Sequence, residues 1–172
     1  MSRTNRGGGE VNMTVTTGSA SDVGVRVNRA GDRDPRDIEI ARIDEMISRS
    51  DIVKLSDGDL AWLRPGDRHG DAIRWLMSRG PAILVVTHGD TTATGYTRSG
   101  SVHVRGQRVA GTDTAEWEDA FMTGLLHALN ARNLPARKSD RKNLRSIGLD
   151  DLRGILHDAN VSAARAVTPV AV

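Results

Sequence analysis

The chain has 172 residues, of which 38% are hydrophobic and 3% are aromatic, so it is long enough for one domain with an aliphatic core. Its net charge of +2 makes no strong case for binding nucleic acid or membrane, and the lack of cysteine excludes disulfides, thiol nucleophiles and cysteine-ligated metals. There is no apolar run near the roughly 18 residues of a membrane span and no secretory signal, so we expect a cytoplasmic protein.

The N-terminal part predicts a tail followed by the first elements of a domain. Residues 1–12 are rich in glycine, arginine and serine, which is typical of a flexible tail, and residues 13–172 form the expected domain. Short β-like runs follow at 12–17 and 23–28. Asp34 and Pro35 then predict the start of a helix that runs to about residue 48.

The inward face of that first helix is expected to hold Ile40, Ile43 and Ile47, with Met46 beside them. A short strand is predicted next, at 51–55.

Ser56 is the expected N-cap of the following helix. Asp57 and Asp59 would then lie in the first helical turn, where a negative charge is favourable.

The middle of the chain predicts a buried strand that ends in a turn. Residues 81–87 form a continuous β-branched apolar run, which is typical of a strand buried on both faces of a parallel sheet. The turn Thr87-His88-Gly89 follows it directly. Residues 94–97 and 101–105 then predict a β-hairpin.

The C-terminal part predicts two amphipathic helices. The stretch 112–124 reads as a loop that becomes a helix, and residues 148–164 form the second helix. The basic segment 132–145 lacks interleaved aromatics, so we interpret it as a solvated linker and not as a nucleic-acid site. Strands that alternate with helices predict an α/β fold with a mainly parallel sheet. The expected inward residues of the first of these helices are Phe121, Leu125, Leu126 and Leu129.

Four short motifs resemble the ribokinase/PfkB family of carbohydrate kinases. Residues 113–121 match the family pattern Asp-Thr-x-Gly-Ala-Gly-Asp-x-Phe at four positions, and residues 56–60 resemble its fructokinase branch. Thr87 and Gly89 match a Thr-x-Gly turn, and Ala159-Asn160 matches an Ala-Asn pair in the last helix. The four matching positions of the first motif are Asp113, Thr114, Asp119 and Phe121.

This resemblance implies a ribokinase-like three-layer α/β/α fold, ATP and Mg²⁺ as cofactors, and phosphoryl transfer from ATP to a sugar hydroxyl. Nucleotide and sugar would then be the partners, with no nucleic acid and no membrane. By residue, it implies that Asp119 is the catalytic base, that Asp59 is near magnesium through water, and that Thr87, Gly89, Asp113, Thr114 and Asn160 bind the nucleotide.

The chain departs from the family pattern at residues 116–118, where Glu-Trp-Glu replaces Gly-Ala-Gly. In the family, the backbone amides of this segment hold the γ-phosphate. A carboxylate about 4 Å from a phosphate costs on the order of 4 kcal/mol at an effective dielectric near 20, and Trp117 adds bulk. The alternative is that Glu116 and Glu118 only stabilise the first helical turn.

The resemblance covers about residues 14–168, and a full family member is much longer, so we expect a domain whose N-terminal half is absent. A truncated parallel sheet would leave an open apolar edge, which predicts a homo-oligomer or a partner chain that covers this edge. Two hypotheses stay open. The chain is a fructokinase-like kinase by descent, or it is a truncated, inactive relative that acts as a binding or interaction module.

Overall fold

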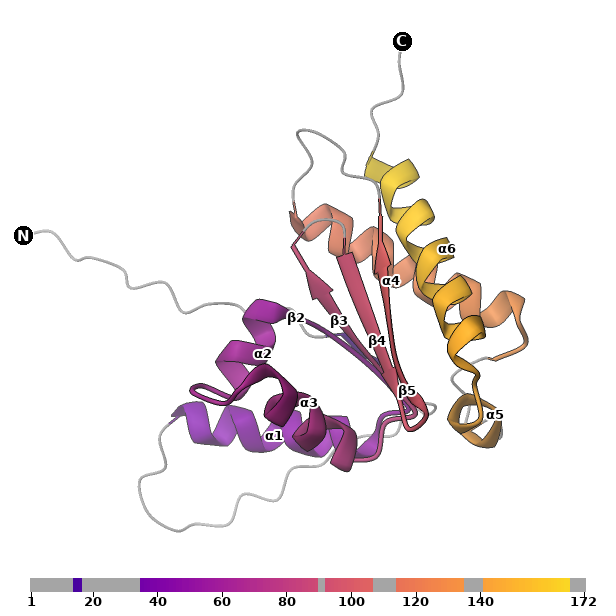
Figure 1. Cartoon of the computed structure of the whole chain (residues 1–172). Helices are drawn as coiled ribbons and strands as arrows, with labels where there is room; N and C mark the ends of the chain where they lie inside the picture. Colours follow the sequence, from indigo (N-terminus) through magenta and orange to yellow (C-terminus); the bar gives the residue numbers. More distant parts are fainter. Residues whose placement is uncertain (1–13, 17–34, 90–91, 107–113, 135–140, 168–172) are drawn as a thin grey trace, which may run out of the picture.

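The computed structural model describes residues 14–16, 35–89, 92–106, 114–134 and 141–167. Helices and strands form a layered α/β fold, as Figure 1 shows. Among the described residues, no helix is long and apolar enough to cross a membrane. The helices are α1 (Pro35–Arg49), α2 (Asp57–Leu63), α3 (His69–Ser78), α4 (Thr114–Ala131), α5 (Arg141–Arg145) and α6 (Leu149–Val167).

The described strands form one five-stranded sheet with the order β1-β2-β3-β4-β5. Only β2 and β3 are parallel, and the other three strand pairs are antiparallel. The sheet is therefore mixed, and the prediction of a mainly parallel sheet is wrong. The strands are β1 (Thr14–Thr16), β2 (Ile52–Ser56), β3 (Ile83–His88), β4 (Thr92–Thr97) and β5 (Gly100–Arg105).

Short connections explain two of the antiparallel pairs, β3 with β4 and β4 with β5, because a parallel crossover needs roughly a dozen or more residues. Helices α2 and α3 provide that length between β2 and β3. Residues 89–91 are all that joins β3 to β4, and Gly89 turns the chain there with a φ of 62°. Residues 98–99 join β4 to β5, which confirms the predicted hairpin.

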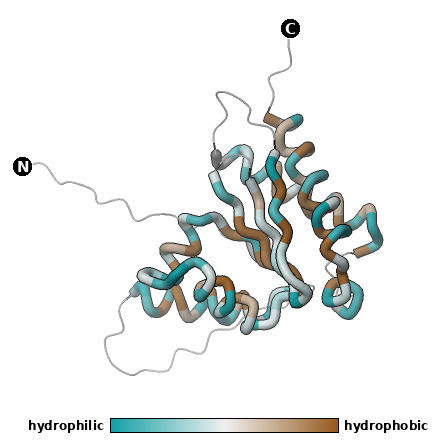
Figure 2. The backbone as a smooth tube through the Cα atoms, in the orientation of Figure 1, coloured by the Kyte–Doolittle hydropathy of each residue, from teal (hydrophilic) through white to brown (hydrophobic). Residues whose placement is uncertain are grey.

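Helices cover both faces of the sheet, so the expected three-layer α/β/α arrangement is confirmed (Figure 1). Helices α1, α2 and α3 pack on one face, where Val53 and Val86 join a cluster of buried residues. Helices α4 and α6 pack on the other face, where Ile52 and Val85 join a second cluster. Consecutive strand residues therefore serve opposite cores, and Figure 2 shows hydrophobic residues along these central strands.

Most of the expected inward residues are buried. Ile43 and Ile47 of α1 are buried, but Met46 is 44% exposed. In α4, Leu126 is 38% exposed, so it does not belong to the buried face of this helix. The expected tail at residues 1–12 and the expected strand at 23–28 lie outside the described residues.

Helices α4 and α6 approach each other most closely at Gly124. A Cβ atom built there would lie 2.7 Å from Cβ of Ser162 and 3.1 Å from Cα and the carbonyl oxygen of Ala159. Because two of these atoms are backbone, Gly124→Ala should lower the free energy of unfolding by about 1–3 kcal/mol in urea denaturation. Gly70→Ala in α3 is the matched control, since nothing lies within 4 Å of its added Cβ. Equal effects of the two changes would contradict the close helix contact.

Candidate functional site

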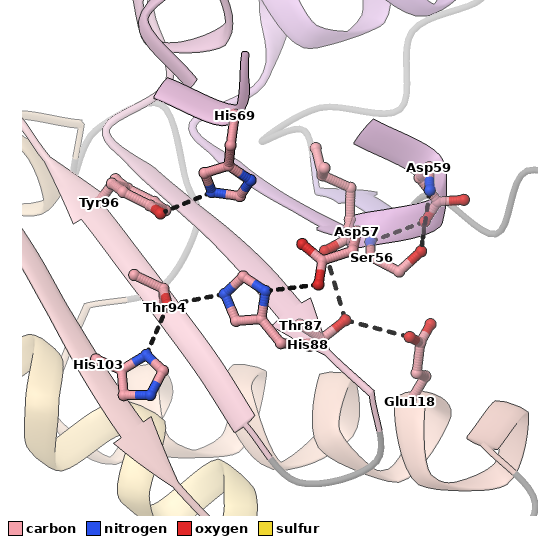
Figure 3. A network of polar contacts seen from close by, with 11 residues as sticks. Ser56, Asp57, Asp59, His69, Thr87, His88, Thr94, Tyr96, His103 and Glu118 are labelled. Carbon is pink, nitrogen blue, oxygen red and sulfur yellow. Dashed lines mark hydrogen bonds and ion pairs between the residues drawn. The ribbon is translucent and has the colours of Figure 1, made fainter. Parts of the chain in front are cut away.

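The candidate site lies at the carboxyl ends of the parallel strands β2 and β3. These ends meet at one edge of the sheet because Ser56 is paired in register with Thr87. Figure 3 shows the polar side chains gathered there, with Glu118 of α4 reaching the same edge. Such an edge is the usual place for ligands in α/β sheets.

Asp59 is part of a capping box at the start of α2. Its Oδ2 accepts from the backbone N of Ser56 at 2.9 Å and from the Ser56 hydroxyl at 2.8 Å. The backbone N of Asp59 donates to Ser56 Oγ at 3.1 Å, which confirms the predicted cap. Asp59 is only 8% exposed, so the capping role fully explains why this carboxylate is fixed.

A buried ion pair joins β2 to α4. Nζ of Lys54 lies 2.7 Å from Oε2 of Glu118, and the two side chains are 2% and 9% exposed. Thr87 Oγ1 lies 3.1 Å from the other carboxylate oxygen, Oε1, and 3.5 Å from the Leu55 carbonyl. A hydroxyl has one proton to donate, and the shorter contact to a charged acceptor is the stronger hydrogen bond. Both Glu118 oxygens are therefore satisfied.

The alternative that Glu118 only stabilises the first helical turn is thus wrong, because this carboxylate is buried and paired with Lys54. A buried carboxylate requires a partner of opposite charge. The sequence signal for this partner is Lys54, the lone charge in the buried strand Ile-Val-Lys-Leu-Ser. Glu116 does lie exposed in the first turn of α4, as the alternative expected.

Trp117 belongs to the hydrophobic core, so its ring does not project into the candidate site at the sheet edge. It is 2% exposed and stacks on Phe121 with ring centroids 5.0 Å apart. Helix α4 already begins at Thr114, so residues 116–118 are helical. Glutamate is a better helix former than glycine by up to about 1 kcal/mol per residue. Residues 116 and 118 therefore favour a helix that already includes this segment.

The other expected site residues lie in three different settings. Asp119 is exposed on α4 directly after Glu118. Gly89 is exposed in the turn after β3, where its positive φ suits glycine. Asp113 lies outside the described residues, and Thr114 is described only by its helical backbone.

Asn160 is set apart from this edge. It lies on α6 next to Ala159, which contacts Gly124 in the middle of α4. Gly124 is six residues beyond Glu118, or roughly 9 Å along the helix axis. Asn160 is 2% exposed, and neither its Oδ1 nor its Nδ2 has a hydrogen-bond partner. Leaving a buried amide unpaired costs about 1–3 kcal/mol, so folding alone does not explain this residue.

A second polar cluster lies on the opposite face of β3, because Thr87 and His88 point to opposite sides (Figure 3). His88 Nδ1 lies 2.7 Å from Asp57 Oδ2, and its Nε2 lies 2.9 Å from Thr94 Oγ1. Thr94 Oγ1 also lies 3.0 Å from Nδ1 of His103. Sequence reasoning missed this cluster, since its members come from α2, β3, β4 and β5.

Proton positions in this cluster follow from the acceptors. A carboxylate only accepts, so neutral His88 holds its proton on Nδ1 toward Asp57. In this state of His88, Nε2 accepts from the Thr94 hydroxyl, whose oxygen can then accept from Nδ1–H of His103; protonation of His88 would reverse both hydrogen bonds. Nearby, Tyr96 OH lies 3.3 Å from a ring nitrogen of His69, and burial raises the pKa of Tyr96.

Metal ligands are sparse in the described ranges. They contain no group of three or more His, Asp or Glu residues that could hold a metal ion. Asp59 Oδ2 is used by the cap, so a magnesium role would fall to its other oxygen through water.

Known proteins resemble this chain in both sequence and fold, although no family model matches it. The fructokinase of Rhizobium leguminosarum bv. trifolii is 40% identical over 100 residues, which are 58% of this chain and 30% of that protein. The structure of fructokinase with bound ATP from Xylella fastidiosa has a TM-score of 0.65 and 25% identity, covering 76% of this chain and 40% of that one. Aminoimidazole riboside kinase from Salmonella enterica, complexed with aminoimidazole riboside and an ATP analogue, has a TM-score of 0.61 and 25% identity, covering 80% and 42%.

These likenesses define the class of fold as ribokinase-like, and the matched part fits the C-terminal part of that fold. The chain is similar in sequence to fructokinases, over 58% of its length in the case of the Rhizobium protein, which confirms the expected resemblance to the fructokinase-like branch of the ribokinase/PfkB kinases. It spans about a third of the length of the curated relatives it matches.

Proposed function

We propose that this chain forms the nucleotide-binding part of an ATP-dependent sugar kinase of the fructokinase type, which transfers a phosphoryl group from ATP to a sugar hydroxyl. The observation that carries this proposal is the sheet edge, where the Thr87–Gly89 turn and the start of α4 adjoin. The named activity of its relatives and the ATP in the Xylella structure support it.

The chain's residues fit a bound nucleotide on two counts. The unpaired amide of Asn160 offers an NH2 donor group beside a carbonyl acceptor, a combination that can recognise the edge of a purine. Gly89 lets the backbone of the turn come close to phosphate oxygens without a side chain in the way. Asp113 and Thr114 would complete the phosphate contacts. ATP supplies the transferable phosphoryl group, and Mg²⁺ near Asp59 would neutralise its charge.

Asp119 is the residue that fits the role of base. Its carboxylate is exposed, so a hydroxyl of a bound sugar can reach it and transfer a proton to it as phosphoryl transfer proceeds. We expect the part of the relatives that this chain does not span to provide most contacts to the sugar.

A second candidate function is nucleotide binding without phosphoryl transfer. The buried Glu118 favours it, because a negative charge directly before Asp119 in the chain opposes the approach of the phosphoryl group that would be transferred.

Calorimetric titration of ATP with Mg²⁺, followed by an assay for fructose phosphorylation, tests the proposal. We expect the wild-type chain to bind ATP, Asn160→Ala to weaken this binding, and Asp119→Asn to lower transfer by about 10²–10⁴-fold at unchanged ATP affinity. Asp151→Asn, an exposed carboxylate on α6, is the matched control. Absence of ATP binding would overturn the proposal, whereas binding without transfer would select the second candidate.

A further inference from the structure

The buried triad of Lys54, Glu118 and Thr87 lies at the sheet edge that carries the function proposed above, and that function assigns no role to the ion pair of Lys54 and Glu118. Lys54 and Thr87 come from the adjacent strands β2 and β3 and point to the same face of the sheet. They are 2% and 0% exposed, so their ammonium and hydroxyl groups face the interior of the protein. Glu118 enters between them from the second turn of α4.

The two groups that hold Glu118 are those that commonly hold an oxyanion. An ammonium and a hydroxyl each contact a different carboxylate oxygen, at 2.7 and 3.1 Å. Phosphate oxygens accept the same kinds of charge-assisted hydrogen bonds. The positive end of α4 lies within about a turn of Glu118 and adds attraction for a negative group. Lys54 and Thr87 therefore form a pair of donors that a carboxylate of the protein itself occupies.

A buried ammonium cannot be left unpaired at low cost. When Glu118 leaves its position, another anion or water must therefore take its place beside Lys54. Glu118 is well suited to be exchanged in this way, because it is attached through a flexible side chain and is not wholly enclosed, at 7% exposure.

We propose that Glu118 is a tethered anion that blocks a phosphate subsite between Lys54 and Thr87, and that a phosphate group of the ligand binds there only after Glu118 has moved out. This autoinhibitory contact deepens the function proposed above and rests on it for the class of ligand, a nucleotide phosphate. Because Asp119 follows Glu118 directly, displacing Glu118 also changes the charge around the residue assigned as base.

Titration with inorganic phosphate tests the blocked subsite. Removing the tethered anion by Glu118→Ala should leave Lys54 and Thr87 free to bind phosphate at least about tenfold more tightly than the wild-type chain does. The same variant should also show an unfolding temperature that rises with phosphate concentration more steeply than that of the wild type. The double variant Lys54→Met/Glu118→Ala should lose both effects, since the ammonium is gone.

Glu118→Gln keeps the test decisive if the alanine variant is poorly folded. It retains the size and one acceptor but removes the negative charge, so it should bind phosphate between the wild-type and alanine levels. A folded alanine or glutamine variant that binds phosphate no better than the wild type would overturn the inference. So would equal binding by the single and double variants, or failure of phosphate to restore folding if both single variants unfold.

Inorganic phosphate lacks the nucleoside, so its binding does not depend on Asn160. If the wild type binds ATP but Glu118→Ala gains no phosphate binding, the inference of a blocked phosphate subsite is wrong and the proposed nucleotide function stands. If the variant binds phosphate but neither protein binds ATP, the proposed nucleotide function fails and the subsite stands.

Discussion

Replacing Lys54 and Glu118 together by methionine should leave the stability of the protein close to that of the wild type, whereas either replacement alone should lower the free energy of unfolding by about 3–5 kcal/mol. Each single change leaves one buried charge without its partner, because the ion pair is 2% and 9% exposed. The double change removes both charges and fills the space with apolar atoms of similar volume.

Urea denaturation of the four proteins in this mutant cycle measures the effect, and the coupling energy follows from the four free energies. The exposed pair of Glu45 and Arg49 on α1 is the matched control, since its side chains are 45% and 58% exposed. We expect Glu45→Ala to cost no more than about 0.5 kcal/mol. Additive effects of the two single changes at Lys54 and Glu118 would contradict a buried, coupled pair.

Trp117→Ala should lower the free energy of unfolding by about 3–5 kcal/mol, although alanine stands at this position in the family pattern that residues 113–121 resemble. The ring is 2% exposed and stacks on Phe121 at 5.0 Å, so its removal leaves a cavity and breaks an aromatic contact. Chemical denaturation measures the loss.

The neighbouring change Glu116→Ala is the matched control for Trp117. Glu116 is exposed on the same turn of α4, so its truncation should change the stability by only a few tenths of a kcal/mol. A loss below about 1 kcal/mol for Trp117→Ala would mean that the ring does not belong to the core.

Local features of this fold could be predicted from the sequence because neighbouring residues determine them. Ser56 and Asp59 form the expected cap since both partners are three residues apart. The apolar run that becomes β3 and the hairpin of β4 and β5 follow from strand patterning and a short connection. The confirmed resemblance to fructokinases rested on equally short motifs.

The features that could not be predicted depend on contacts between distant residues. Lys54 and Glu118 are 64 residues apart, so charge patterning along the chain gave no indication of their pairing. Trp117 looked like an obstacle because its direction depends on where α4 begins and which face meets the sheet. The sequence predicts a mainly parallel sheet because a continuous apolar strand favours parallel pairing, but β3 is buried with an antiparallel neighbour on one side.

The contact of α4 with α6 at Gly124 sets the distance between Asp119 on α4 and Asn160 on α6. A Cβ atom at Gly124 would lie only 2.7 Å from Cβ of Ser162, which leaves no room for a methyl group there, so the two helices are in close contact at this point. Asp119 at one end and Asn160 farther along are therefore held at a constant separation. A molecule that touches both must have the matching length, so the helix pair would distinguish ligands by how far they extend as well as by their chemical groups.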